Sequence, residues 1–311
     1  MKAAFVFSGQ GAQAVGMGKD IYEKSPAGRA VYDEANKVLG WDLTGICFEG
    51  PAEKLMESKY CQVAIFVTSM ACLEVFKEKT GNRITPVGCA GLSLGEYAAF
   101  TASSYFQFAD AVKLVAKRAE LMDEATKKAR GTMASVITNG EISAEAIQKI
   151  CEECGIGVAN YNSAMQIVIS GNVDGVARAT AVLKETAGVR KIIPLKVAGA
   201  YHSPMMAEAG EALAPYLEAT PASAMTIPVA QNFTGKITEK AEEVKPNLIR
   251  QVAGSVQWVS CVNALCNLGA DTFIEFGPGN VLTGLIKKIV PEKATFNVGN
   301  FEDPDKIIAG I

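Results

Sequence analysis

The fold is decided by the stretch Pro86-Val-Gly-Cys-Ala-Gly-Leu-Ser-Leu-Gly-Glu-Tyr-Ala-Ala99. Its first part, 86–92, is a short apolar run typical of a buried strand, and 95–102 is predicted to be a helix. Between them, Gly91-Leu-Ser-Leu-Gly95 fits the Gly-x-Ser-x-Gly elbow, a sharp strand-to-helix turn that exposes a serine hydroxyl. This context favours Ser93 as a nucleophile over a purely structural turn. The backbone N–H of Leu94, at the helix N-terminus, can donate to a developing oxyanion.

The chain contains one histidine, His202. A serine nucleophile needs an imidazole that takes the hydroxyl proton and returns it to the leaving group. If Ser93 is a nucleophile, His202 is therefore its only possible histidine partner. The alternative is a core histidine with satisfied hydrogen bonds, and no Asp or Glu stands next to it in sequence to complete a conventional triad.

Composition excludes several classes of function. Of 311 residues, 49% are hydrophobic, and the net charge is −3, so a large core is possible and nothing indicates nucleic-acid binding. No run approaches the roughly 18 consecutive apolar residues of a membrane span. The apolar run at 3–7 is too short for a signal peptide. We expect a cytoplasmic protein with no membrane contact.

Eight cysteines are present, several of them inside apolar runs. There a free thiol packs as a small hydrophobe. The pair Cys151-Glu-Glu-Cys154 has metal-ligand spacing but no second pair, so we expect no metal site.

The order of predicted elements indicates an α/β fold with an insertion. Strand-like and helix-like segments alternate at both ends, as in a hydrolase-like parallel sheet. Between them, 132–138, 143–153, 157–162, 166–170, 173–187 and 191–197 give the ferredoxin-like order β-α-β-β-α-β. We therefore expect a discontinuous large subdomain, 1–130 and 198–311, and a small subdomain, 131–197. Gly131 and 197–199 are the expected crossing points, which places His202 beside the interface.

A buried cation is the sharpest indication of the substrate. On the helix predicted at 108–129, Arg118 falls on the apolar stripe together with Val115 and Met122. A buried guanidinium needs a carboxylate, which either the protein or a substrate can supply, and spacing alone does not decide between them.

The glycine-rich turn after the first strand also has more than one interpretation. Gly9-x-Gly11-x-x-Ala14 fits a dinucleotide fingerprint, but the acidic residues at the required distance, Asp33 and Glu34, lie in a helix-like stretch. We favour a loop whose backbone N–H is the second oxyanion donor; a purely structural turn is the remaining alternative.

Taken together, these motifs resemble the malonyl-CoA:acyl-carrier-protein transacylase family of fatty-acid and polyketide synthesis. The matching segments, in the family's order and spacing, are Gly9-Gln-Gly-Ala-Gln13, Gly91–Ala99, Arg118 with Met122, Gly199-Ala-Tyr-His-Ser203, Arg250-Gln251 with Val256-Gln-Trp258, and Gly277-Pro-Gly-Asn-Val-Leu282. They span essentially the whole chain.

The resemblance implies a role for each site residue. Ser93 carries the acyl group and His202 is the base, oriented by the backbone carbonyl of Gln251. Gln10 and Leu94 supply the oxyanion N–H groups, and Arg118 binds the malonyl carboxylate. The acyl pocket is lined by Met122, Asn162 and Tyr201. The implied partners are malonyl-CoA and an acyl carrier protein, the mechanism is ping-pong, and no cofactor is required.

Three residues depart from the family's usual pattern: Leu92 replaces a histidine, Ser8 a proline and Tyr201 a phenylalanine. An aromatic side chain at 201 is similar to malonyl-selective members. Two alternatives to a transacylase share part of this pattern. A serine esterase or thioesterase has the same elbow and base but no use for a buried cation. A carrier-protein binding module with a degenerate site would lack Ser93, His202 or Arg118.

Overall fold

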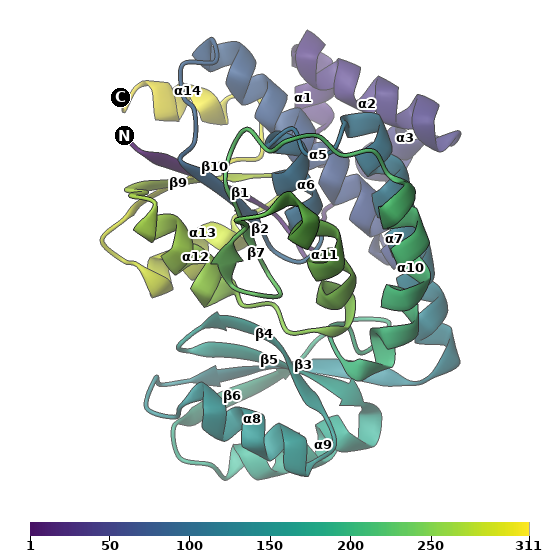
Figure 1. Cartoon of the computed structure of the whole chain (residues 1–311), viewed down its shortest axis with the longest axis vertical. Coiled ribbons are helices and arrows are strands. Elements are labelled where there is room, and N and C mark those ends of the chain that lie inside the picture. Colours follow the sequence, from purple (N-terminus) through teal and green to yellow (C-terminus); the bar gives the residue numbers. More distant parts are fainter. Residues whose placement is uncertain (311) are drawn as a thin grey trace.

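Two β-sheets organise the molecule, which is described here for residues 1–310 from a computed structural model (Figure 1). The larger sheet has the order β10-β9-β1-β2-β7-β8 and is parallel except for the β7–β8 pair. Its strands are β1 (Ala3–Phe7), β2 (Gly88–Gly91), β7 (Val229–Gln231), β8 (Lys236–Ile237), β9 (Thr272–Phe276) and β10 (Ala294–Val298).

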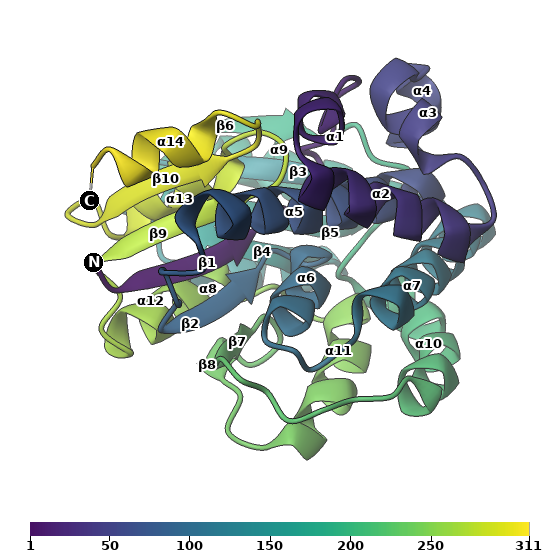
Figure 2. The ribbon, with the colours of Figure 1, turned by 90° about the horizontal axis from the view of Figure 1, so that it is seen from above.

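Helices cover both faces of this sheet, as Figure 2 shows from above. One face contacts α5 (Ser58–Thr80), α6 (Gly95–Ala102) and α14 (Asp303–Ile308), and the other contacts α12 (Trp258–Asn267) and α13 (Val281–Ile289). Strand β1 shows why. Phe5 and Phe7 join the apolar cluster around α5, whereas Ala4 and Val6 join the cluster around Trp258. Alternate side chains of a strand point to opposite faces, so both faces are apolar and both must be covered.

The remaining helices surround α5 or lie toward the second sheet. They are α1 (Lys19–Lys24), α2 (Pro26–Leu39), α3 (Leu43–Glu49), α4 (Ala52–Met56), α7 (Phe108–Lys128), α10 (Ala207–Ala219) and α11 (Val244–Ala253), with short 3-10 helices at Pro204–Met206 and Ala241–Glu243.

The central helix α5 is long and apolar enough to cross a membrane by length and composition, although its longest unbroken apolar run is only Val63–Val67. Its most apolar 18-residue window has a mean hydropathy of 1.3, and 83% of that window is buried inside the protein. Core helices of soluble proteins pass the same test, and α5 packs on the sheet and on α2 and α7.

The second sheet, at the bottom of Figure 1, is antiparallel, with the order β4-β5-β3-β6. Its elements are β3 (Gly131–Thr138), α8 (Ala144–Glu153), β4 (Gly157–Ser163), β5 (Gln166–Asn172), α9 (Val173–Lys184) and β6 (Val189–Pro194). This is the predicted ferredoxin-like arrangement, so the predicted fold class is confirmed.

The second sheet packs on both sides. One face forms a separate core with α8 and α9, and the other sends Met133, Ala159 and Val168 into the main core. The chain enters and leaves this sheet at neighbouring points, because a Cβ on Gly131 would lie 2.6 Å from the Cβ of Ala200. These contacts support the proposed division into 1–130 plus 198–311 and 131–197.

Some predicted boundaries were wrong. Strand β6 ends at Pro194 and not at Val197, and α9 ends at Lys184 and not at Ala187. The two edge strands β8 and β10 were not predicted. They are short or half-exposed, so neither has the continuous apolar run that marks a central parallel strand.

Candidate active site

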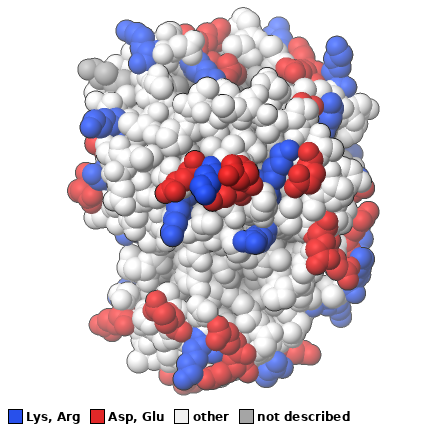
Figure 3. Space-filling model, viewed as in Figure 1, with Lys and Arg blue, Asp and Glu red and all other residues white. Residues whose placement is uncertain are grey.

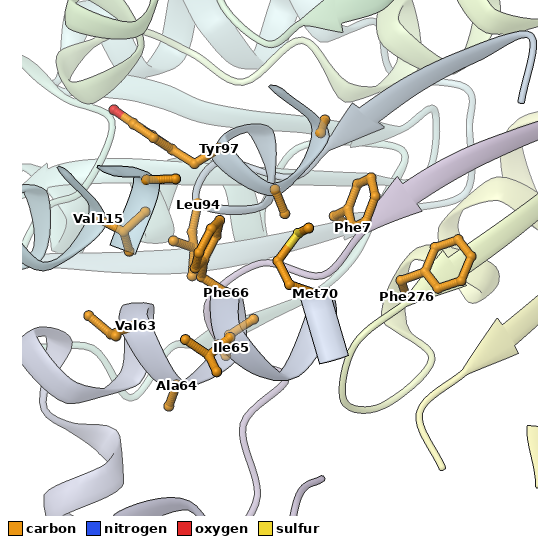
Figure 4. Close-up of a cluster of buried hydrophobic side chains, with 14 of the residues drawn as sticks. Phe7, Val63, Ala64, Ile65, Phe66, Met70, Leu94, Tyr97, Val115 and Phe276 are labelled. Atoms are coloured by element: carbon orange, nitrogen blue, oxygen red, sulfur yellow. The ribbon is translucent and has the colours of Figure 1, made fainter. Parts of the chain in front are cut away.

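The predicted elbow lies between β2 and α6 and brings Ser93 to the carboxyl end of the sheet. Figure 4 shows Leu94 in the buried cluster with Phe66 and Met70 of α5, which anchors the turn from below. Close packing explains the glycines. A Cβ on Gly91 would lie 1.9 Å from the carbonyl of Gly95, and a Cβ on Gly95 would lie 2.2 Å from the carbonyl oxygen of Phe7.

Ser93 itself has a φ of 53°, a left-handed conformation that is costly for a residue other than glycine. The side chain of Asn232 stabilises it. Its Oδ1 accepts from the Ser93 N–H at 2.6 Å, and its Nδ2 donates to the Gly91 carbonyl at 2.8 Å. The amide therefore holds both arms of the turn.

Ser93 and His202 form a hydrogen-bonded pair, with 2.7 Å between Ser93 Oγ and His202 Nε2. His202 Nδ1 lies 2.8 Å from the backbone carbonyl of Gln251. A carbonyl can only accept, so Nδ1 carries the hydrogen in the neutral ring and Nε2 is left free to accept the serine proton. The imidazole is oriented by a carbonyl, and no carboxylate of residues 1–310 makes a hydrogen bond or salt bridge to it.

The pKa of His202 falls from its usual 6.5 to about 4, because burial and the nearby positive charge of Arg118 both disfavour the imidazolium. His202 is only 6% exposed. The ring is therefore neutral at physiological pH, which is the state a general base requires.

Two backbone N–H groups, one in the elbow and one in the loop packed against it, have no acceptor within residues 1–310. Within residues 1–310, neither the Gln10 N–H nor the Leu94 N–H donates to any protein group. The loop carrying Gln10 is pressed against the elbow, because a Cβ on Gly9 would lie 2.5 Å from the carbonyl oxygen of Leu92. The pair can stabilise an oxyanion formed at Ser93. Asp33 lies inside α2, not at the end of a second strand, so nothing supports the dinucleotide alternative.

Arg118 lies on α7 with only 1% of its surface exposed. Its guanidinium donates to Gln62 Oε1, to Ser93 Oγ at 3.1 Å and to Gln251 Oε1 at 3.1 Å. Across residues 1–310, no Asp or Glu oxygen lies within the 4.0 Å of a salt bridge to it. Burial lowers the pKa of this guanidinium, yet arginine stays protonated in proteins. The site therefore holds a buried cation without a direct counter-ion, next to the serine hydroxyl.

The other predicted pocket residues differ in how closely they approach this centre. Met122 Sδ accepts from Gln62 Nε2 at 3.6 Å, and Gln62 in turn accepts from Arg118. The Tyr201 hydroxyl lies 2.6 Å from Ser58 Oγ, and within residues 1–310 no hydrogen bond joins Tyr201 to Ser93 or Arg118. Burial raises the pKa of Tyr201, so the phenol is protonated. Asn162, on β4, is buried, but no hydrogen bond in residues 1–310 joins it to Ser93 or Arg118.

Four residues that hydrogen-bond to the predicted site residues were not predicted from the sequence: Ser58, Gln62, Glu96 and Asn232. All four are buried polar side chains, and Gln62 and Glu96 sit within otherwise apolar helical stretches. For Gln62 and Glu96 a polar residue on a buried helix face was an available signal of position, as it was for Arg118. Asn232 lies in the turn after β7 and carries no such signal.

Two departures from the family pattern have structural explanations. Ser8 Oγ donates to the carbonyls of Phe276 and Pro278, both at 3.3 Å, so it ties the first loop to the end of β9. Leu92 packs partly buried against the Trp258 cluster, where its apolar side chain needs no hydrogen bond.

The closely spaced thiols Cys151 and Cys154 lie in the core of the second sheet. Cys151 and Cys154 are buried free cysteines, and burial raises the pKa of Cys151 to about 12. In residues 1–310, no group of three or more His, Cys, Asp or Glu side chains is placed to hold a metal ion.

Comparison with known proteins identifies the family. The acyl transferase domain family matches residues 4–300. The malonyl CoA-acyl carrier protein transacylase of Bacillus subtilis is 40% identical over 308 residues, which cover 98% of this chain and 95% of the relative. That of Escherichia coli is 36% identical over 312 residues, covering 99% and 98%.

Solved structures agree. An acyl carrier protein S-malonyltransferase from Vibrio cholerae has a TM-score of 0.93 at 36% identity, covering 99% of this chain and 100% of that one. A malonyl-transacylase solved in complex with its type II PKS acyl-carrier protein has a TM-score of 0.94 at 33% identity, with both chains fully covered. With this similarity over its whole length, and with its serine, histidine and arginine gathered at one centre, the chain belongs to the malonyl-CoA:acyl-carrier-protein transacylase family.

Proposed function

We propose that this protein moves a malonyl group from malonyl-CoA to the phosphopantetheine thiol of an acyl carrier protein through a malonyl ester of Ser93. One observation carries the assignment of the site: Ser93 Oγ lies 2.7 Å from the free nitrogen of a neutral histidine and 3.1 Å from a buried, uncompensated arginine. The first contact activates a nucleophile, and the second selects an acyl group that ends in a carboxylate.

In the first half-reaction, Ser93 Oγ attacks the thioester carbonyl while His202 Nε2 accepts its proton. The Gln10 and Leu94 N–H groups stabilise the tetrahedral oxyanion. The carbon–sulfur bond then breaks, and CoA leaves with the proton held by His202. In the second half-reaction, the carrier thiol gives its proton to His202 and attacks the ester. The second tetrahedral intermediate then collapses: the bond between the acyl carbon and Ser93 Oγ breaks, and His202 returns the proton to Ser93 Oγ. No electrons are exchanged, so the steps need no redox cofactor.

Arg118 binds the distal carboxylate of the malonyl group. Its planar fork suits a carboxylate, and burial strengthens the charge pair. A serine esterase or thioesterase would use the same elbow and base, but a buried cation without a counter-ion would only disfavour a neutral acyl chain. Met122, Asn162 and Tyr201 are proposed to form the walls of the acyl pocket. A degenerate binding module is disfavoured because Ser93, His202 and Arg118 are all present and in contact.

The proposed setting is the cytoplasm, with a carrier protein as the macromolecular partner. The surface gives no sign of a nucleic-acid partner: on the face in Figure 3, basic and acidic side chains are interspersed, and the net charge is −3.

Intact-mass analysis tests the proposal. Incubation with malonyl-CoA should add one malonyl group, which peptide mapping places on Gly91–Gly95, and a holo carrier protein should then remove it. Ser93→Ala should abolish the adduct. His202→Ala should slow acylation by at least ~10²–10⁴-fold, the usual contribution of a general base to the rate. An adduct on a cysteine would contradict the mechanism.

A further inference from the structure

A buried carboxylate behind the nucleophile has no place in the mechanism above. Glu96, in the first turn of α6, is 0% exposed and makes no salt bridge with any cation in the described chain. Its Oε2 accepts from Gln251 Nε2 at 2.7 Å and from the Asn232 N–H at 3.3 Å. Its Oε1 has no partner in residues 1–310. Burying an acid is costly, so its position calls for a reason.

The reason lies in the side-chain amide of Gln251. Its Nε2 donates to Glu96 and to the Ser93 carbonyl at 2.8 Å, and its Oε1 accepts from Arg118 at 3.1 Å. A carboxylate and a carbonyl only accept, and a guanidinium only donates. Rotating the amide by 180° would therefore lose all three hydrogen bonds. It would also place the amide oxygen against the Glu96 carboxylate and the amide NH2 group against the Arg118 guanidinium. Glu96 supplies the shortest of these contacts.

We propose that Glu96 is a positioning residue: acting through the Gln251 side chain, it holds Arg118 against Ser93 while leaving the guanidinium free of a direct carboxylate. The inference rests on the proposed function of Arg118. A carboxylate in contact with Arg118 would occupy the fork that the malonyl group needs. Placed one amide further away, Glu96 offsets part of the cost of burying the arginine without competing for it.

The same residue links this arrangement to the base. The backbone carbonyl of Gln251 orients His202, while its side chain orients Arg118. A displaced side chain should therefore disturb carboxylate binding, whereas the imidazole keeps its carbonyl partner. This separation defines the test.

The test measures kcat/KM for Ser93 acylation by malonyl-CoA and by acetyl-CoA in the full-length protein. The variants are Glu96→Leu, Gln251→Leu and the double variant. Malonyl acylation should fall on the order of 10²-fold in each single variant, the effect of a misplaced positioning group. Acetyl acylation, which does not use Arg118, should fall far less. The double variant should be no worse than Gln251→Leu, because Glu96 acts through that side chain.

Two further variants make the test specific. Glu96→Gln can still accept from Gln251 through its side-chain oxygen, so it should restore most of the malonyl-to-acetyl ratio lost in Glu96→Leu. Glu275→Leu is the matched control, since Glu275 is equally buried but accepts from the Leu282 and Thr283 N–H groups at the start of α13. It should lower stability without changing the ratio.

Three results would overturn the inference: equal losses for the two substrates in Glu96→Leu, independent losses that multiply in the double variant, or a wild-type ratio in Gln251→Leu. The malonyl-to-acetyl ratio of Gln251→Leu tests the inference even if Glu96→Leu does not fold. A wild-type protein that is not acylated on Ser93 would instead refute the proposed function itself.

Discussion

His202 can act as a base only while it is neutral, and its surroundings keep it so. Burial and the charge of Arg118 lower its pKa to about 4. As pH falls through that value the imidazole gains a proton and can no longer accept one from Ser93. We therefore expect kcat/KM for malonyl acylation, which reports the free enzyme, to decline near pH 4 and not near the ~6.5 of an ordinary histidine.

Rapid-quench mass spectrometry across this range would measure the decline, with circular dichroism to confirm folding at each pH. Burial raises the pKa of Glu96 to about 7, so its charge also changes in the range. Glu96→Gln removes that second titration and is the control. If kcat/KM in Glu96→Gln still declined near pH 6.5, the surroundings of His202 would not be keeping it neutral.

Arg118 should select the acyl group by charge. Since no carboxylate within residues 1–310 pairs with Arg118, the substrate carboxylate is its proposed partner. Arg118→Ala should therefore cost ~2–5 kcal/mol in malonyl transfer, the range for removing one member of a buried charge pair. Acetyl transfer should fall far less or rise, because the cation no longer disfavours a neutral acyl chain. Arg118→Lys should rescue poorly, since an ammonium lacks the two-pronged fork. Turnover of malonyl-CoA and acetyl-CoA in wild type and both variants measures this, and equal losses would make Arg118 a structural residue.

At the level of elements, the geometry of the elbow depends on backbone contacts that admit no side chain. A methyl group at Gly95 would lie 2.2 Å from the Phe7 carbonyl oxygen, so α6 must move away from β1. Gly95→Ala should lower the free energy of unfolding by about 1–3 kcal/mol or more and abolish acylation. Gly284→Ala is the control: this exposed glycine in α13 has no atom near its Cβ position, and alanine should stabilise the helix by roughly 0.5–1 kcal/mol. Urea unfolding compares the two. An active, stable Gly95→Ala protein would contradict the packing argument.

The same elements show what the sequence could predict. Local patterns predicted α6, α7 and the ferredoxin-like order, because each depends on a periodic apolar stripe or a marked turn. Arg118 was found because a charge interrupts such a stripe. The roles of Glu96 and Asn232 could not be found in this way. Their partners lie more than 100 positions away in the chain, and only the folded arrangement brings them together.

Considered as a whole, the molecule holds its base between the two sheets. The turn that carries His202 is tied to the large sheet's side by Gln251 and Ser58 and to the second sheet by β5, where Ser170 Oγ donates to the Tyr201 carbonyl at 2.7 Å. The inserted sheet therefore does more than add surface: it fixes the residue immediately before the base.

Ser170→Ala should remove this tie. The variant loses one buried hydrogen bond, worth about 0.5–1.5 kcal/mol, and leaves the Tyr201 carbonyl without that donor. Because the turn loosens beside His202, malonyl acylation should also slow, by roughly tenfold if the whole of that energy positions the base. Ser143→Ala is the matched control. Ser143 caps α8 in the same sheet-and-helix unit by accepting from the Ala146 N–H at 3.2 Å, and its loss should cost a similar ~0.5–2 kcal/mol in stability. Among residues 1–310 no hydrogen bond joins Ser143 to the His202 turn, so the acylation rate of this variant should equal that of wild type. Urea unfolding and single-turnover acylation, measured on both variants, separate stability from positioning. If both variants lost stability yet acylated Ser93 at the wild-type rate, the second sheet would have no part in holding His202.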